Sequence, residues 1–342
     1  MATITKSIGT SSRDYSTLQA WEDAIPANLV SADEKWVGEC YNDAEFSATE
    51  NILTISGHTT DATRYIELTA AAGQSFQDHA SVQSNALTYD ATKGVGVKIT
   101  NGYRYNISSS DGYTRIKRLQ FLCTSIASHC SFAGANTLVE ACIFNGIAGG
   151  SKGVVKASNG VTFRSCLIID GSTGNEPAAI VDYGPSAFYY CTIVRSTGTP
   201  GSSKAIEYID YHSGTSNIVA STAIFGFSAP TDIGTSTGVD ATNSKNNATD
   251  NASGLPGSTG NQHSLTYASQ FESVSADFRA KTGANLLDAG ATDSTNGAND
   301  IAGTARPSGS AYDIGCWELV QSTATSFLPQ LRRSMRRLIA RR

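Results

Sequence analysis

The chain has 342 residues and a formal net charge of −5, and only 16% of its residues are charged. It has 32 glycines and too few Leu residues and Lys–Glu pairs for a helical protein, while its length alone would allow two globular domains. No stretch approaches the ~18 consecutive apolar residues of a membrane-spanning helix. The first twelve residues contain no basic start followed by an apolar run, so we expect no secretory signal peptide.

Residues 1–50 are predicted to form an N-terminal cap. Leu18, Trp21 and Ile25 have helical spacing and follow Ser16 or Thr17, either of which suits the N-cap of a helix. Less regular strands are predicted next, around residues 52–55, 65–68 and 95–99.

A six-residue phrase then recurs five times. Each copy has an apolar residue, two mostly polar residues, a small or apolar residue, a variable position and another apolar residue. The fourth positions are separated by 23, 24, 25 and 31 residues, a period typical of stacked repeats. The copies begin at Ile116, Val139, Phe163, Phe188 and Val219.

The content of the phrase favours a β repeat. Its positions four and six alternate around an outward residue, as in Cys142-Ile143-Phe144, and its apolar residues are β-branched, aromatic or Cys, which fits a half-buried strand. Segments rich in Gly, Ser, Asn and Asp separate the copies and suit tight corners. We therefore predict an all-β parallel β-helix over residues 51–318, in which each strand pairs with its counterpart in the next coil at ~4.8 Å. For residues 231–260 we prefer elaborated turns with a short strand over disorder.

Cys142, Cys166 and Cys191 occupy the fourth position of successive phrases and should stack inside the lumen. The sequence has no CxxC pair and no His at ligand spacing, so we predict no metal site and no cofactor. Seven cysteines is an odd number, which fits free thiols in a protein made in a reducing cytoplasm. Cys316 is predicted to be the most exposed of them.

Two groups of polar residues are weak candidates for a site. Asp182, Glu207 and Asp210, with Asp170, Arg195 and His212 nearby, could supply the paired carboxylates of a glycosidase, although solvated corner residues give the same pattern. A cluster of tyrosines could form a glycan-binding or protein-binding face, or simply cover the outside of strands. The cluster consists of Tyr183, Tyr189, Tyr190, Tyr208 and Tyr211.

Residues 278–290, 300–307 and 312–318 carry the phrases Phe-Arg-Ala-Lys-Thr-Gly-Ala-Asn-Leu-Leu-Asp-Ala-Gly, Asp-Ile-Ala-Gly-Thr-Ala-Arg-Pro and Tyr-Asp-Ile-Gly-Cys-Trp-Glu. They resemble the closing coils of right-handed β-helix proteins of the pectate-lyase-like superfamily. Ala280 stands where that family usually has Leu, and 284–286 replace its Ser-Pro-Ala. The resemblance implies a right-handed, single-stranded helix but no particular activity, because the fold carries lyases, hydrolases, adhesins and phage spikes. Residues 2–43 are similar to proteins of tailed bacteriophages, which points to a virion.

Residues 319–342 form a linker followed by a short amphipathic, basic segment, predicted to be a helical attachment peptide. Residues 317–342 hold six of the 25 basic residues and one of the 30 acidic ones, so their net charge is +5 against −10 for the rest. This asymmetry suggests docking into a groove on a partner protein. The alternatives are packing along the chain's own rod or a sister subunit, and, less favoured, contact with nucleic acid or a membrane surface. The predicted contact residues are Phe327, Leu328, Leu331, Arg332, Arg333, Met335, Arg336, Arg337, Leu338, Arg341 and Arg342.

Three functions remain open. The first is a non-enzymatic virion protein, such as a capsid decoration, head fibre or tail-associated rod, made in the host cytoplasm and docked to a capsid, portal or tail protein. The second is a tailspike-like depolymerase of host polysaccharide. The third is an adhesin that binds a host surface glycan. A homotrimer is compatible with each.

Overall fold

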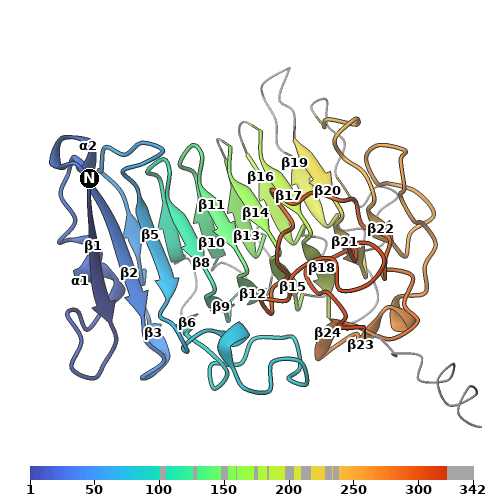
Figure 1. Ribbon diagram of the computed structural model, residues 1–342, viewed down its shortest axis with the longest axis horizontal. Helices are drawn as coiled ribbons and strands as arrows, with labels where there is room; N and C mark the ends of the chain where they lie inside the picture. The colour runs from blue at the N-terminus through green and yellow to red at the C-terminus, as the bar shows by residue number, and fades with distance from the viewer. Residues whose placement is uncertain are drawn as a thin grey trace, which may run out of the picture.

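The computed structural model describes residues 1–100, 105–125, 129–147, 153–158, 160–172, 176–182, 185–196, 204–208, 217–227, 233 and 239–321. These residues form a right-handed parallel β-helix, seen from the side in Figure 1, in which three parallel sheets run along the rod. No helix among the described residues is long and apolar enough to cross a membrane.

Each sheet gathers one strand from successive coils. The first has the order β1 (Ala2–Ile8), β2 (Glu34–Cys40), β5 (Ile66–Ala70), β8 (Arg115–Lys117), β11 (Leu138–Glu140), β14 (Thr162–Arg164), β17 (Ala187–Tyr189) and β20 (Ile218–Ala220). The second contains β4 (Thr54–Ile55), β7 (Tyr105–Ser109), β10 (His129–Phe132), β13 (Val155–Ala157), β16 (Ala179–Val181) and β19 (Ile206–Tyr208). The third contains β3 (Phe46–Ala48), β6 (Gly96–Ile99), β9 (Gln120–Cys123), β12 (Ile143–Gly146), β15 (Leu167–Asp170), β18 (Thr192–Arg195), β21 (Ala223–Phe225) and β22 (Ala248–Thr249).

The five phrases stack in the register that their spacing predicts: Ile116 pairs with Val139, Val139 with Phe163, and so on to Val219. The alternating end of each phrase leads into a strand of the third sheet, as predicted, and its first residues belong to a further strand. The phrase spans two strands, one in the first sheet and one in the third, and its third residue turns the corner between them with a positive φ of 48° to 59°. These corner residues are Arg118, Ala141, Ser165, Tyr190 and Ser221.

The left-handed corner explains how both parts of the phrase contribute to the same core. One residue with positive φ redirects the chain, while the apolar residues on both sides still point into the lumen. The corner N–H groups are not lost, because each donates to the next coil, as Ala141 does to the Arg164 carbonyl at 3.0 Å.

Aromatic rings and thiols fill the lumen. Phe163 and Phe188 stack in neighbouring coils with ring centroids 4.8 Å apart. The predicted cysteine ladder is confirmed: Cys142, Cys166 and Cys191 are fully buried. Their thiols donate to backbone carbonyls across the corner, as the Cys166 thiol does to the Arg164 carbonyl at 3.3 Å. Burial raises the pKa of the Cys166 thiol well above its usual value, so the ladder is packing and not chemistry.

The predicted N-terminal helix is present as α1 (Leu18–Glu22), whose N-cap Thr17 accepts a hydrogen bond from the Ala20 N–H. Its Trp21 is buried against β2, where a Cβ on Gly38 would lie only 2.7 Å from the indole ring. A second short helix, α2 (Leu29–Ala32), follows. Residues 1–50 therefore supply both helices and the strands β1, β2 and β3 of the sheets.

The C-terminal phrases do not form closing coils of the stack. The strand β22 lies within 239–260, whose other residues form mainly turns and bends, and residues 265–321, the C-terminal strap, fold back along the outside of the third sheet (Figure 1, orange to red). The strap contains the short helical turn η2 (Tyr267–Ser269) and the antiparallel hairpin β23 (Phe271–Ser273) and β24 (Asp277–Ala280).

The strap covers a second hydrophobic core on the outer face of the third sheet. Ile143, Leu167 and Phe225 from the sheet pack there with strap residues such as Phe271, Leu286, Ile314 and Trp317. The fifth, outward position of each phrase is therefore buried, because leaving Ile143 and Leu167 in water would cost ~1.5 to 3 kcal/mol each. Cys316, predicted to be exposed, is fully buried in this core.

Candidate functional site

A polar pocket of about 280 Å³ lies between the outer face of the first sheet and the strap. The sheet side comes from β5, β8, β11 and the corners that follow β8, β11 and β14. The opposite side comes from 295–300 of the strap, and Gln77 of the helical turn η1 (Phe76–Asp78) closes one end. The lining residues are Glu67, Thr69, Gln77, Lys117, Arg118, Glu140, Ala141, Ser165, Thr295, Asn296, Ala298, Asn299 and Asp300.

Lys117 is the central charge on the sheet side. Its ammonium nitrogen lies 3.4 Å from a carboxylate oxygen of Glu67 and 4.0 Å from one of Glu140. Glu140 lies directly opposite Lys117 in the parallel ladder between β8 and β11. One ammonium group therefore lies near two carboxylates, which leaves these three side chains together with a net negative charge beside the pocket.

Arg118, the corner residue, supplies the second cation. Its guanidinium donates to the Thr69 hydroxyl at 3.1 Å and to the Ala70 carbonyl at 2.7 Å, and it lies 4.0 Å from Asp78. These contacts hold the side chain against the coil before it, so Arg118 forms a fixed part of the wall.

The strap side is held to the sheet at two points. The Ser165 hydroxyl donates to the Asn299 carbonyl at 2.8 Å, and the Tyr190 hydroxyl donates to the Ala291 carbonyl. Gly297 presses on the Tyr190 ring so closely that a Cβ there would lie 2.3 Å from a ring carbon. Both Ser165 and Tyr190 are corner residues, so the left-handed turns of the coils position the roof of the pocket.

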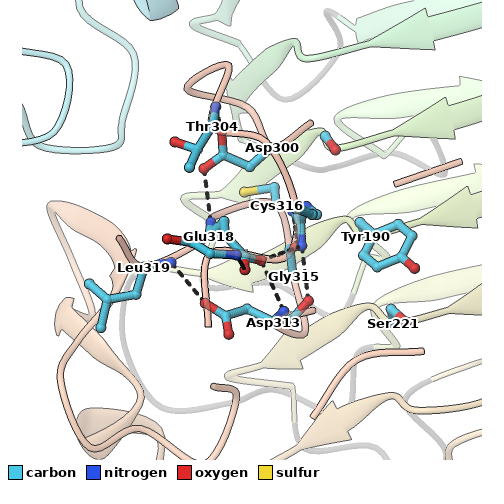
Figure 2. A network of polar contacts seen from close by, with 12 residues as sticks. Tyr190, Ser221, Asp300, Thr304, Asp313, Gly315, Cys316, Glu318 and Leu319 are labelled. Carbon is cyan, nitrogen blue, oxygen red and sulfur yellow. Dashed lines mark hydrogen bonds and ion pairs between the residues drawn. The ribbon is translucent and has the colours of Figure 1, made fainter. Parts of the chain in front are cut away.

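Asp300 joins the pocket to a network of buried charges within the strap (Figure 2). Its carboxylate accepts hydrogen bonds from the N–H groups of Ala302, Thr304 and Glu318 at 2.6 to 2.9 Å. Because both oxygens are already used in this way, Asp300 orders the strap and does not aim an oxygen at a ligand.

Asp313, Glu318 and Arg306 complete this network. Asp313 accepts from the Leu319 N–H at 2.8 Å, and Glu318 accepts from the Asp313 N–H at 3.0 Å. Arg306 donates to the carbonyls of Asp313 and Gly315 at 2.9 and 2.8 Å. These Asp, Gly, Arg and Glu residues belong to the C-terminal phrases 300–307 and 312–318, and their role here is to close the strap on itself.

Burial changes the titration of two of these carboxyls. It raises the pKa of Asp300 to about 6, against the opposing effects of Arg306 and the backbone donors. Burial also raises the pKa of Asp313 to about 6. The raised pKa of each carboxyl therefore results from burial within the strap. The oxygens of Asp300 and Asp313 already accept backbone hydrogen bonds and are not open to a substrate.

Among the described residues, each carboxylate considered for catalysis pairs with a cation. Asp182 forms an ion pair with Lys156, and Glu207 forms one with Lys204 at 3.3 Å. Asp170 is fully buried and lies 2.6 Å from the equally buried guanidinium of Arg195. Asp210 and His212 lie outside the described residues.

The five tyrosines of the predicted binding face also lie in different places. Tyr208 points into the lumen and Tyr190 lies beneath the strap, so neither belongs to an exposed face. Tyr189 is half-buried on the outer face of β17. Tyr183 and Tyr211 lie outside the described residues, as do all the predicted contact residues of the tail from Phe327 to Arg342.

The pocket was not predicted from the sequence, although the repeated phrases contain a signal for it. Lys117 and Glu140 occupy the second position of consecutive phrases, and aligning the phrases places them side by side. Nothing in the phrases shows that 295–300 returns to cover them.

Comparisons with known proteins add little. No family model matches the chain, and no curated protein matches it. Among solved structures, the pectin methylesterase of Aspergillus niger is similar over 85% of this chain and 93% of its own, with 10% sequence identity and a TM-score of 0.40. The assignment of a parallel β-helix rests on the strand register above, and the activity of that esterase is not transferred to this chain.

Proposed function

We propose that this protein is a non-enzymatic structural component of a tailed-bacteriophage virion, attached to the particle through its arginine-rich C-terminal segment. The observation that carries the proposal is the anchoring of the strap, because it fixes the point from which that segment leaves the rod.

The last described residues are held firmly. Glu318 is fully buried, the Leu319 N–H donates to Asp313, and the Gln321 side chain donates to Asp288 at 2.9 Å. The strap in turn is joined to the β-helix through its apolar core. A load applied to residues 322–342 would therefore pass into the rod and not unravel a terminal coil.

The distribution of charge also supports attachment through the C-terminal segment. Residues 317–342 have a net charge of +5 and the rest of the chain −10, so the rod tends to stay soluble while the tail seeks an acidic groove. The partner we expect is a capsid, portal or tail protein with such a groove, and the apolar residues Leu331, Met335 and Leu338 would supply contact area.

Deletion of 322–342 tests the proposal. The truncated rod should keep its unfolding temperature but be absent from purified particles, and the peptide fused to an unrelated soluble protein should bring that protein into particles. The control is the same fusion with Arg332, Arg333, Arg336 and Arg337 changed to Gln. Normal incorporation of the truncated chain would contradict the proposal.

The polar pocket favours a second candidate, a glycan-binding protein or a depolymerase of host polysaccharide. Its carboxylates, amides and ammonium group could bind the hydroxyls of a sugar. Binding of host polysaccharide that is lost in Glu140→Gln would support a glycan-binding role. Release of reducing ends by the wild-type protein would support a depolymerase.

A further inference from the structure

The two ends of the β-helix differ in how their backbone edges are covered. At the C-terminal end the edge of β20 is capped, because the Val219 N–H donates to the Ser244 hydroxyl at 3.1 Å and the Ser221 N–H donates to the Lys245 carbonyl at 2.9 Å. At the N-terminal end, α1 covers the lumen, but β1 is the outermost strand of the first sheet (Figure 1).

In β1 the even-numbered residues pair with β2. The Ala2 N–H donates to the Asp33 carbonyl at 2.8 Å, and the Ile8 carbonyl accepts from the Tyr41 N–H at 2.9 Å. In a parallel ladder the odd-numbered residues must then direct their N–H and C=O groups to the other side, away from the rod.

Only part of this outer edge is covered. At Ser7 the N–H donates to the Asp14 carboxylate at 2.8 Å, and the carbonyl accepts from the Tyr15 N–H at 3.1 Å. Thr3 and Thr5 are exposed, and within the described chain their backbone groups have no hydrogen-bond partner. An uncovered edge of this kind is a template for another strand.

Two apolar side chains are exposed beside the edge. Met1 is 65% exposed and Val30 is 38% exposed. The amino group of Met1 lies 2.6 Å from a carboxylate oxygen of Asp33, the C-cap residue of α2. This ion pair places Met1 beside the end of the helix that contains Val30. Lys6, the one cationic side chain of β1, lies 3.7 Å from Asp14 and is already paired.

We propose that β1 pairs with β1 of a second copy of this chain, antiparallel and about a two-fold axis at Ile4. Thr3 of one copy then lies opposite Thr5 of the other, and the two such pairs form four hydrogen bonds from the groups that are now open. Ile4 of one copy lies opposite Ile4 of the other in a pair that exchanges no hydrogen bonds. This agrees with the register of β1, because the N–H and C=O groups of Ile4 already point to β2.

A second copy fits this edge for two reasons. Head-to-tail growth is blocked because the β20 edge is capped, which leaves a closed two-fold contact as the arrangement for like chains. The register also places Lys6 opposite Ala2 of the other copy, so the two Lys6 side chains do not face each other.

Cross-linking of the full chain tests the register. All seven native cysteines are buried, so a cysteine introduced by Ile4→Cys, at a partly buried position that packs against the core, would be the more accessible thiol. Two such residues across the axis would be ~4.5 Å apart between Cα atoms, within disulfide range. Mild oxidation should give a covalent dimer of Ile4→Cys, whereas Ser7→Cys, in which the two thiols lie at opposite ends of the paired strands, should stay uncross-linked.

Sedimentation measurements test the association itself, independently of the cysteine variants. Wild type and Thr5→Val should have the mass of two chains, because the contact uses backbone groups. Thr5→Pro removes an N–H that β2 does not use, and it should have the mass of one chain with unchanged circular dichroism. The proposal would be overturned by a one-chain or three-chain mass for wild type, or by cross-linking of Ser7→Cys to the same extent as Ile4→Cys. A one-chain mass would mean that the edge is available to a strand of another protein.

Discussion

Arg306 and Glu318 face each other inside the strap, with the Arg306 Nη1 atom 3.4 Å from a carboxylate oxygen of Glu318 and neither side chain exposed to solvent. Arg306 is also the donor that links the carbonyls of Asp313 and Gly315. The pair therefore joins three segments of a region that has little regular secondary structure, and its loss should be felt throughout the strap.

Arg306→Met should lower the free energy of unfolding by about 3 to 5 kcal/mol, because it leaves Glu318 as a buried charge without its partner. Urea unfolding would measure the loss, and limited proteolysis should cut within 265–321 first. Arg13→Met, which breaks the more exposed pair with Asp43, is the matched control and should change little. Equal effects of the two changes would contradict a special role for the buried pair.

Stability should fall as the pH rises through about 6. The pKa of Asp300 and of Asp313 is raised from 3.8 to about 6 in the folded protein, so folding favours the protonated form. Their contribution is fully present below pH 3.8 and is lost as the pH rises through about 6, by about 2 to 3 kcal/mol for one such group. Urea unfolding at a series of pH values across this range should show the decline.

The control for this pH effect is Asp300→Asn, which cannot titrate. Whatever its absolute stability, its unfolding free energy should depend less steeply on pH over the same interval. A wild-type protein that becomes more stable from mildly acidic to neutral pH would show that these carboxyls are ionised at little cost.

The thiols should be inert in the folded protein. All seven cysteines are buried, and burial raises the pKa of Cys316 to about 12 and that of Cys166 well above its usual value. A thiol reagent such as DTNB should therefore label none of them in native buffer and all seven in denaturant. Fast labelling of Cys316 alone would mean that the strap opens readily.

Gly297→Ala should destabilise the roof of the pocket, because its Cβ would lie 2.3 Å from the Tyr190 ring. We expect a loss of about 1 to 3 kcal/mol, as for other overpacked sites. Gly171→Ala, whose Cβ would meet nothing closer than 3.4 Å, is the control. In a Tyr190→Ala background the Gly297→Ala change should cost much less, and additive losses in this double-mutant cycle would exclude the contact as the cause.

The repeat shows how far the sequence carries the fold. The spacing of Val139, Phe163 and Phe188 predicted the stacking register, because residues that pair between parallel coils must recur once per coil. The corner inside the phrase was missed because Arg118, Ala141, Ser165 and Tyr190 share no chemistry: the left-handed turn is imposed by the lumen on whichever residue stands there.

The scaffold could be predicted from the sequence, since a period of 23 to 25 residues with β-branched, aromatic and Cys positions can bury its apolar side chains only by stacking coils. Three features are visible only in the folded chain: Cys316 is buried, Asp300 and Glu318 support a strap, and Lys117 and Glu140 line a pocket. Each of these depends on contacts between residues far apart in the chain, between the 265–321 segment and the side of the rod. Such contacts follow no period, so no local pattern of residues could reveal them.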